Sequence, residues 1–164
     1  MLKEFRLKEF NKNPFDLIGN QWMLIAAGDQ NKHNMMTASW GTLGVLWNKN
    51  VAIVFVRPTR YTCEFIEKHD YFSLNFPLDK KVHNICGSKS GRDIDKTKAC
   101  NLTPVFADGT VYFKESEMAL ICKKIYKTEL DSKMFLAPEI EKLYPLKDYH
   151  KVFIGEIVKA YKNV

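Results

Sequence analysis

The sequence of 164 residues lacks the long apolar runs of a membrane protein. No stretch approaches the roughly 18–20 apolar residues that a helix needs to cross a bilayer. The first ten residues mix acidic and basic side chains and contain no apolar signal-peptide segment. We therefore expect a cytoplasmic protein with no membrane partner.

The familiar catalytic and nucleotide-binding motifs are absent as well. There is no Gly-x-Gly-x-x-Gly after a strand, no Gly-x-x-x-x-Gly-Lys-Ser/Thr and no His-Glu-x-x-His. The histidines have no metal-ligand spacing, so we expect no metal site and place each in a loop or on the surface: His33, His69, His83 and His150. An enzyme whose cofactor carries the chemistry needs none of these motifs.

Cysteine is scarce and widely spaced. The four residues are Cys63, Cys86, Cys100 and Cys122, and no two of them form a Cys-x-x-Cys pair. Such spacing supports neither a zinc knuckle nor a redox dithiol. We expect four buried thiols, all reduced in an intracellular protein.

What is present is an ordinary folded composition, 46% hydrophobic and 27% charged, which predicts a single domain over residues 1–164. The net charge is +6, but the lysines alternate with acidic residues instead of forming a basic patch. We therefore expect no nucleic-acid partner and favour an anionic small ligand.

Apolar patterns predict a mainly β fold. The predicted strands are Trp22–Ala27, Val51–Val56, a half-buried Phe72–Phe76, Val111–Phe113, Met118–Tyr126 and Val152–Tyr161. Short helices are predicted from Asn13-Pro14 to Gly19, over Thr59–His69, and over Lys80–Cys86 with Gly87 as the stop. Six or seven strands without long crossovers favour an antiparallel barrel.

Three segments combine polar groups in ways that suit a cofactor. In His33–Gly41, an extended chain directs Thr37 and Ser39 to one face and Met36, Ala38 and Trp40 to the other. Hydroxyls and amides beside apolar side chains suit a flat heteroaromatic ring with a polar edge. The competing interpretation is an ordinary amphipathic strand.

The other two segments suit an anion. Arg57–Thr62 follows the clearest strand and opens a helix, whose free N–H groups favour phosphate. There Thr59 or Thr62 offers a hydroxyl and Arg60 a forked cation. Ser88–Lys96 combines small residues with two basic ones. The alternatives are a plain helix cap and a solvated loop.

Taken in order, Met36–Gly41, Arg57–Thr62, Ser90–Lys96 and the C-terminal Tyr149–Ile157 resemble the flavin reductase-like family, which includes flavoredoxin. The resemblance implies an antiparallel split β-barrel with short peripheral helices that binds FMN, with FAD as the other candidate. It also implies a homodimer with flavin near the subunit interface.

The resemblance further implies a role for each segment. It places along the flavin ring the residues Asn34, Met35, Met36, Thr37, Ala38, Ser39 and Trp40. It assigns to the phosphate the residues Arg57, Thr59, Arg60, Tyr61 and Thr62, and to the closing loop Ser90, Gly91 and Lys96. It puts His150 near the open face of the ring, as the one candidate catalytic residue.

The implied function is an NAD(P)H-dependent flavin reductase, in which a hydride passes from nicotinamide to flavin N5. One alternative is an FMN-binding electron carrier that a redox partner protein reduces. Another is a binding module that has kept the barrel and lost the flavin. No nicotinamide motif is readable, so the sequence leaves the three open.

Overall fold

The computed structural model describes residues 1–164 and contains ten strands and four short α-helices. The strands are β1 Leu2–Glu4, β2 Met23–Gly28, β3 His33–Ala38, β4 Gly41–Leu46, β5 Lys49–Val56, β6 Tyr71–Pro77, β7 Pro104–Ala107, β8 Thr110–Phe113, β9 Ser116–Glu129 and β10 Lys151–Asn163. The helices are α1 Pro14–Gly19, α2 Tyr61–Lys68, α3 Val82–Ser88 and α4 Lys96–Ala99, with 3-10 turns η1 Leu7–Glu9, η2 Ser132–Met134 and η3 Pro138–Leu143.

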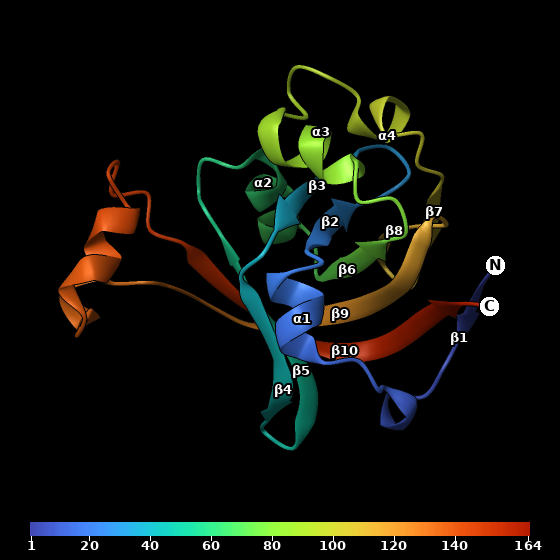
Figure 1. The fold of residues 1–164 in the computed structure, drawn as a ribbon, viewed down its shortest axis with the longest axis horizontal. Helices are drawn as coiled ribbons and strands as arrows, with labels where there is room; N and C mark the ends of the chain where they lie inside the picture. The colour runs from blue at the N-terminus through green and yellow to red at the C-terminus, as the bar shows by residue number, and fades with distance from the viewer.

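Eight of the strands form one antiparallel sheet in the order β3-β2-β6-β9-β10-β5-β4, and β1 pairs with β10 at a branch. The sheet curls, with α2, α3 and α4 at the end where β2 and β3 lie (Figure 1). Strands β7 and β8 form a separate hairpin. The predicted mainly β, antiparallel fold is confirmed, with more strands than the six or seven expected.

Local sequence explains where most elements begin. The side chain of Asn13 accepts a hydrogen bond from the Phe15 amide at 3.0 Å, and Pro14 occupies the first helical position, as predicted. Helix α3 differs from the prediction, because Gly87 lies inside it and it ends at Ser88. Strand β4 escaped prediction because its glycines and partly exposed residues give no clear alternation.

Strand β6 is not half-buried as its alternation predicted, because every residue from Phe72 to Pro77 is buried. One face packs in the main core, and the hairpin strand β8 covers the other. The polar residues bond to that strand: Ser73 donates to the Val111 carbonyl, and the Phe113 amide donates to Asn75 at 3.1 Å. The polar residues in the alternating pattern of β6 therefore face hydrogen-bond partners on β8, and not solvent.

The core has two main parts. Twenty-one buried residues fill the curled sheet beneath α1 and α2, and eight more lie between β2, β3, α3 and the hairpin. The segment that carries η2 and η3 extends away from the barrel, in orange in Figure 1. No helix has both the length and the apolar character needed to cross a membrane.

Gly155 allows β10 to cross β6 and β9 closely. A Cβ at this position would lie 2.7 Å from the Cβ of Cys122 and from the ring of Phe72, both fully buried. We expect Gly155→Ala to lower the free energy of unfolding by about 1–3 kcal/mol, because a packed core cannot yield that space. Urea denaturation measures the effect. Gly44→Ala in β4 is the matched control, because nothing lies within 4 Å of its Cβ; equal losses would contradict the argument.

Candidate functional site

Two adjoining cavities lie between β3 and the loop that joins α3 to α4, and one of them also reaches the start of α2. The first, here called the α2 cavity, has a volume of about 180 Å³. Its lining residues come from all three elements: Asn34, Met36, Thr59, Arg60, Tyr61, Thr62, Ser88, Lys89, Ser90, Gly91, Arg92 and Lys96. The structure thus brings the three sequence segments together at one place.

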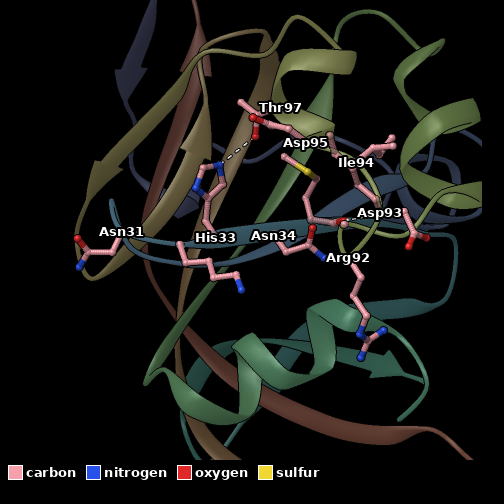
Figure 2. Close-up of a pocket in the computed structure, with 12 residues that line it drawn as sticks. Asn31, His33, Asn34, Arg92, Asp93, Ile94, Asp95 and Thr97 are labelled. Atoms are coloured by element: carbon pink, nitrogen blue, oxygen red, sulfur yellow. Dashed lines mark hydrogen bonds between the residues drawn. The ribbon is translucent and has the colours of Figure 1, made fainter.

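The second, here called the Asn31 cavity, has a volume of about 410 Å³ and is lined in part by the same loop (Figure 2). Residues 31–35 and 91–97 line it. His33 lies inside it, with Nε2 2.9 Å from the Thr97 hydroxyl. Arg92 extends toward α2, where it pairs with Glu64 and lies 4.5 Å from the Tyr61 ring centre.

Asn34 and Gly91 form the wall between the two cavities. Asn34 is 5% exposed, and its side-chain amide donates to the Thr62 hydroxyl at 2.9 Å. A Cβ on Gly91 would lie 2.0 Å from the Asn34 oxygen, so any larger residue here would displace the Asn34 side chain. The loop therefore packs directly against β3.

Lys96 is the buried charge of this site. Its side chain is at the floor of both cavities, and the residue is 5% exposed. The ammonium donates to the carbonyls of Met35 at 3.0 Å and Cys86 at 3.1 Å, and no carboxylate lies close enough to neutralise it. Burial lowers the pKa of Lys96 because the charge has lost water without gaining a counter-ion.

A second cation, Arg60, lines the α2 cavity at the start of α2. Its Nη1 donates to the Gly87 carbonyl at 3.0 Å, and no carboxylate pairs with it. Arg60 is also the N-cap residue of an eight-residue helix that no side chain caps. The first N–H groups of a helix have no partner within the helix. Two cations and free amide donors therefore face a cavity that contains no acid partner for them.

Arg57 does not join this cavity. Its Nη1 lies 2.6 Å from an Asp148 oxygen, and its guanidinium stacks 4.8 Å from the Tyr144 ring centre. These residues belong to the segment between β9 and β10. Arg57 therefore fastens that segment to the end of β5.

A separate group, here called the His150 cluster, surrounds the predicted catalytic residue. His150 is 7% exposed, its Nδ1 lies 2.8 Å from the Tyr144 hydroxyl, and its ring centre lies 5.2 Å from that of Trp40. Burial, with the Arg57 cation nearby, lowers the pKa of His150 to about 4. The imidazole is therefore neutral at pH 7.

The rest of β3 leads from the cavities toward this cluster. Met35 packs in the smaller core, while Met36 and Ala38 pack in the main core, so both faces of the strand are buried. Ser39 and Trp40 follow the strand and line a different hollow, beside α1. Thr37 lies between the two regions, where its hydroxyl is 2.9 Å from Nδ1 of His83.

His83 was expected at the surface, and the structure corrects this. It is 6% exposed, and its Nε2 is buried without a partner. The contact between Nδ1 and the Thr37 hydroxyl joins α3 to β3. No spacing in the sequence indicated this contact, since His83 and Thr37 lie on different elements. His150 lies in a loop, as expected, but it is buried rather than exposed.

The chain also matches a known protein family. The model of the "Flavin reductase like domain" matches residues 15–163, nearly the whole chain. The chain belongs to this family. The resemblance found in the sequence motifs is therefore confirmed, and the fold is that of the flavin reductase-like split barrels.

Solved structures agree with the family assignment. Flavoredoxin from Methanosarcina acetivorans is 26% identical, with a TM-score of 0.68 over 87% of this chain and 68% of its own. An FMN-binding domain of a flavin reductases-like enzyme from Shewanella baltica is 21% identical, with a TM-score of 0.70 over 99% and 77%. An NADH:FAD oxidoreductase from Streptomyces globisporus is 14% identical, with a TM-score of 0.66 over 87% and 80%. Among curated proteins, no sequence matches.

The two buried histidines make the stability of this flavin reductase-like protein depend on pH. Burial lowers the pKa of both His83 and His150 from 6.5 to about 4. Below about pH 6.5 the unfolded chain binds protons that the folded chain does not, so stability falls as the pH falls toward 4. We expect each histidine to account for about 1–3 kcal/mol of this loss.

Urea denaturation from about pH 7.5 to 4.5 measures the loss. The double variant His83→Gln/His150→Gln should show a shallower decline than the wild type. A decline of equal steepness in both proteins would show that other groups cause it.

Proposed function

We propose that this protein binds FMN, with the phosphate in the α2 cavity, and acts as an oxidoreductase of the NAD(P)H:flavin reductase type. The observation that carries the proposal is the buried ammonium of Lys96, which has two carbonyl partners and no carboxylate. A buried cation of this kind is costly unless an anion accompanies it. A phosphate in the cavity would supply that charge.

The remaining lining suits a phosphate monoester. Arg60 offers a guanidinium, Thr59 and Ser90 offer hydroxyls, and the start of α2 offers backbone N–H groups. Arg92 is committed to Glu64, so its charge is already partly neutralised. We therefore assign the phosphate to Lys96 and Arg60, and treat Arg57, bound to Asp148, as structural.

For the flavin ring we propose a position along β3, from Asn34 toward Trp40 and the His150 cluster. Thr37 would place its hydroxyl, which His83 holds in position, at the polar edge of the ring. Nδ1 of His150 is engaged with Tyr144, so a ligand would meet Nε2 of a neutral imidazole. His150 would then position a ligand by a hydrogen bond and not by charge.

A bound flavin would supply the redox chemistry, that is, a site for hydride transfer from nicotinamide and for onward electron transfer. The chain's own task is to bind and orient the ring, exclude water and place donors where negative charge develops. No acid-base pair is required of the protein for this chemistry.

The second candidate is an electron carrier that a redox partner protein reduces. It is favoured by the similarity to a flavoredoxin at 26% identity, whereas the NADH:FAD oxidoreductase is 14% identical. The Asn31 cavity continues beyond the phosphate position and offers space for the adenylate half of FAD, so FAD remains a second ligand to test.

We also propose a homodimer. The segment between β9 and β10 exposes large apolar side chains, among them Leu136 at 97% and Leu146 at 80%. Exposed apolar groups gathered on one projecting segment are typical of an interface. A second subunit that covers them would lie close to the His150 cluster.

The first expected outcome is a flavin spectrum. Purified protein, or protein incubated with FMN, should absorb in the blue-visible range and unfold at a higher temperature. At 100 times the Kd, bound FMN adds about 2.7 kcal/mol to the free energy of unfolding. A colourless protein whose melting temperature ignores both FMN and FAD would overturn the proposal. Oxidation of NADH or NADPH by the FMN-loaded protein identifies a reductase, and its absence identifies the electron carrier.

The second expected outcome separates the phosphate from the ring. Arg60→Ala and Lys96→Met should each weaken FMN binding roughly ten- to a hundredfold, because a hydrogen bond to a charged group contributes about 1.5–3 kcal/mol. Riboflavin has the same ring and no phosphate, so its affinity should stay nearly unchanged. Fluorescence titration measures both ligands.

Lys98→Met is the matched control for Lys96→Met, because Lys98 is two positions away with an 87% exposed side chain. It should leave both affinities unchanged. If FMN and riboflavin lose affinity equally in the Arg60 and Lys96 variants, these residues support the fold and the phosphate lies elsewhere.

A further inference from the structure

Two cysteines that the sequence separates meet beside the α2 cavity. Cys86 lies in α3 and Cys100 directly follows α4, and their sulfur atoms are 3.6 Å apart. The other two, Cys63 and Cys122, lie in the main core. Four unrelated thiols were expected from the spacing, so this pair is a product of the fold alone.

Lys96 holds the backbones of both cysteines. Its ammonium donates to the Cys86 carbonyl at 3.1 Å, and its own carbonyl accepts from the Cys100 amide at 2.9 Å. Val82 and Leu102 pack in the smaller core with Cys86, and Cys100 packs against that cluster. These contacts keep the two sulfurs close to each other.

We propose that Cys86 and Cys100 are a thiol-oxidation site at which a peroxide forms a reversible disulfide. Cys100, a partly exposed residue, attacks hydrogen peroxide through its sulfur; the O–O bond breaks, one water leaves and a sulfenic acid remains. The Cys86 sulfur then attacks the Cys100 sulfur and displaces the hydroxyl as a second water. The two thiols lose two electrons and two protons in all, and the peroxide gains them.

The order of attack follows from burial. Cys86 is fully buried, and burial with the neighbouring Cys100 raises the pKa of Cys86 to about 12. Cys86 is therefore held as a thiol and acts second, on a sulfur already in contact with it. The S–S distance has to shorten from 3.6 Å to about 2.05 Å, a change that side-chain rotation and a small shift of α4 can supply.

The disulfide would tie the base of the loop that closes both cavities. The two cysteines lie 14 positions apart, and Ser88, Ser90, Gly91 and Lys96 all fall between them. A bond across its base restricts the opening of the loop. Resting on the proposed function, we infer that oxidation slows the release of FMN.

The chemical test needs no flavin. Reduced protein and protein treated with hydrogen peroxide are denatured without reductant, alkylated and weighed by mass spectrometry. Reduced protein should show four free thiols and treated protein two, with a Cys86–Cys100 peptide and no added oxygen. Dithiothreitol should restore four. Four thiols after treatment, a different pair, or an oxidised Cys100 without a crosslink would each overturn the proposal.

Matched variants and a loop cut extend the test. Cys63→Ser should still lose two thiols, whereas Cys100→Ser should lose none. Trypsin cleavage after Arg92 should give fragments that separate without reductant in the reduced protein and stay joined in the oxidised one. Oxidised wild type should also melt about 5 °C higher than reduced wild type, with no such difference in Cys100→Ser. Separation of the fragments after oxidation, or equal melting temperatures, would contradict the crosslink.

The release of FMN is measured last. We expect oxidation to slow it about threefold or more in wild type and to leave it unchanged in Cys100→Ser, because a restrained loop costs less to order. Equal release rates would overturn the link to the cavity. Formation of the disulfide in a protein that binds no flavin would support the oxidation site and reject the proposed function.

Discussion

The lone ammonium of Lys96 is the constraint around which this site is organised. It lies away from solvent, binds the carbonyls of Met35 and Cys86, and so joins β3 to α3. A hydrocarbon side chain would fill the space without bridging the two carbonyls, and a carboxylate nearby would remove the demand for an external anion. The protein instead keeps a buried positive charge with two carbonyl partners and no acidic one. The close approach of Gly91 to Asn34 fixes the loop on one side of Lys96. The hydrogen bond from Arg60 to the Gly87 carbonyl fixes helix α2 on the other side.

The two ends of the site differ in charge. At the α2 cavity two cations face the same space, while in the His150 cluster the imidazole is neutral and Arg57 is balanced by Asp148. A ligand with one anionic and one uncharged aromatic end matches this gradient in a single orientation. The distribution of charge would therefore determine the orientation of such a ligand as well as its position in the site.

Much of the fold was predictable because short-range signals decide it. Apolar runs marked β2, β5 and β10, and Asn13 with Pro14 marked the start of α1. The sequence also indicated the segments that line the α2 cavity, through their mix of hydroxyls and basic residues. What it did not reveal depends on long-range packing. The burial of β6 depends on the hairpin strand β8, the burial of His83 and His150 on neighbouring elements, and the Cys86–Cys100 contact on α3 meeting α4.

The position of β10 has a consequence for the protein as it is made. This strand pairs with β9, β5 and β1. In the sheet, β4 and β5 are therefore joined to β3, β2, β6 and β9 only through β10, which is synthesised after all of them. During synthesis the edges of β5 and β9 stay open until residues 151–163 have left the ribosome. Open strand edges are sites of aggregation. Conditions that slow the translation of residues 151–163, or that stop it before them, should therefore prolong the time for which these edges are open to aggregation.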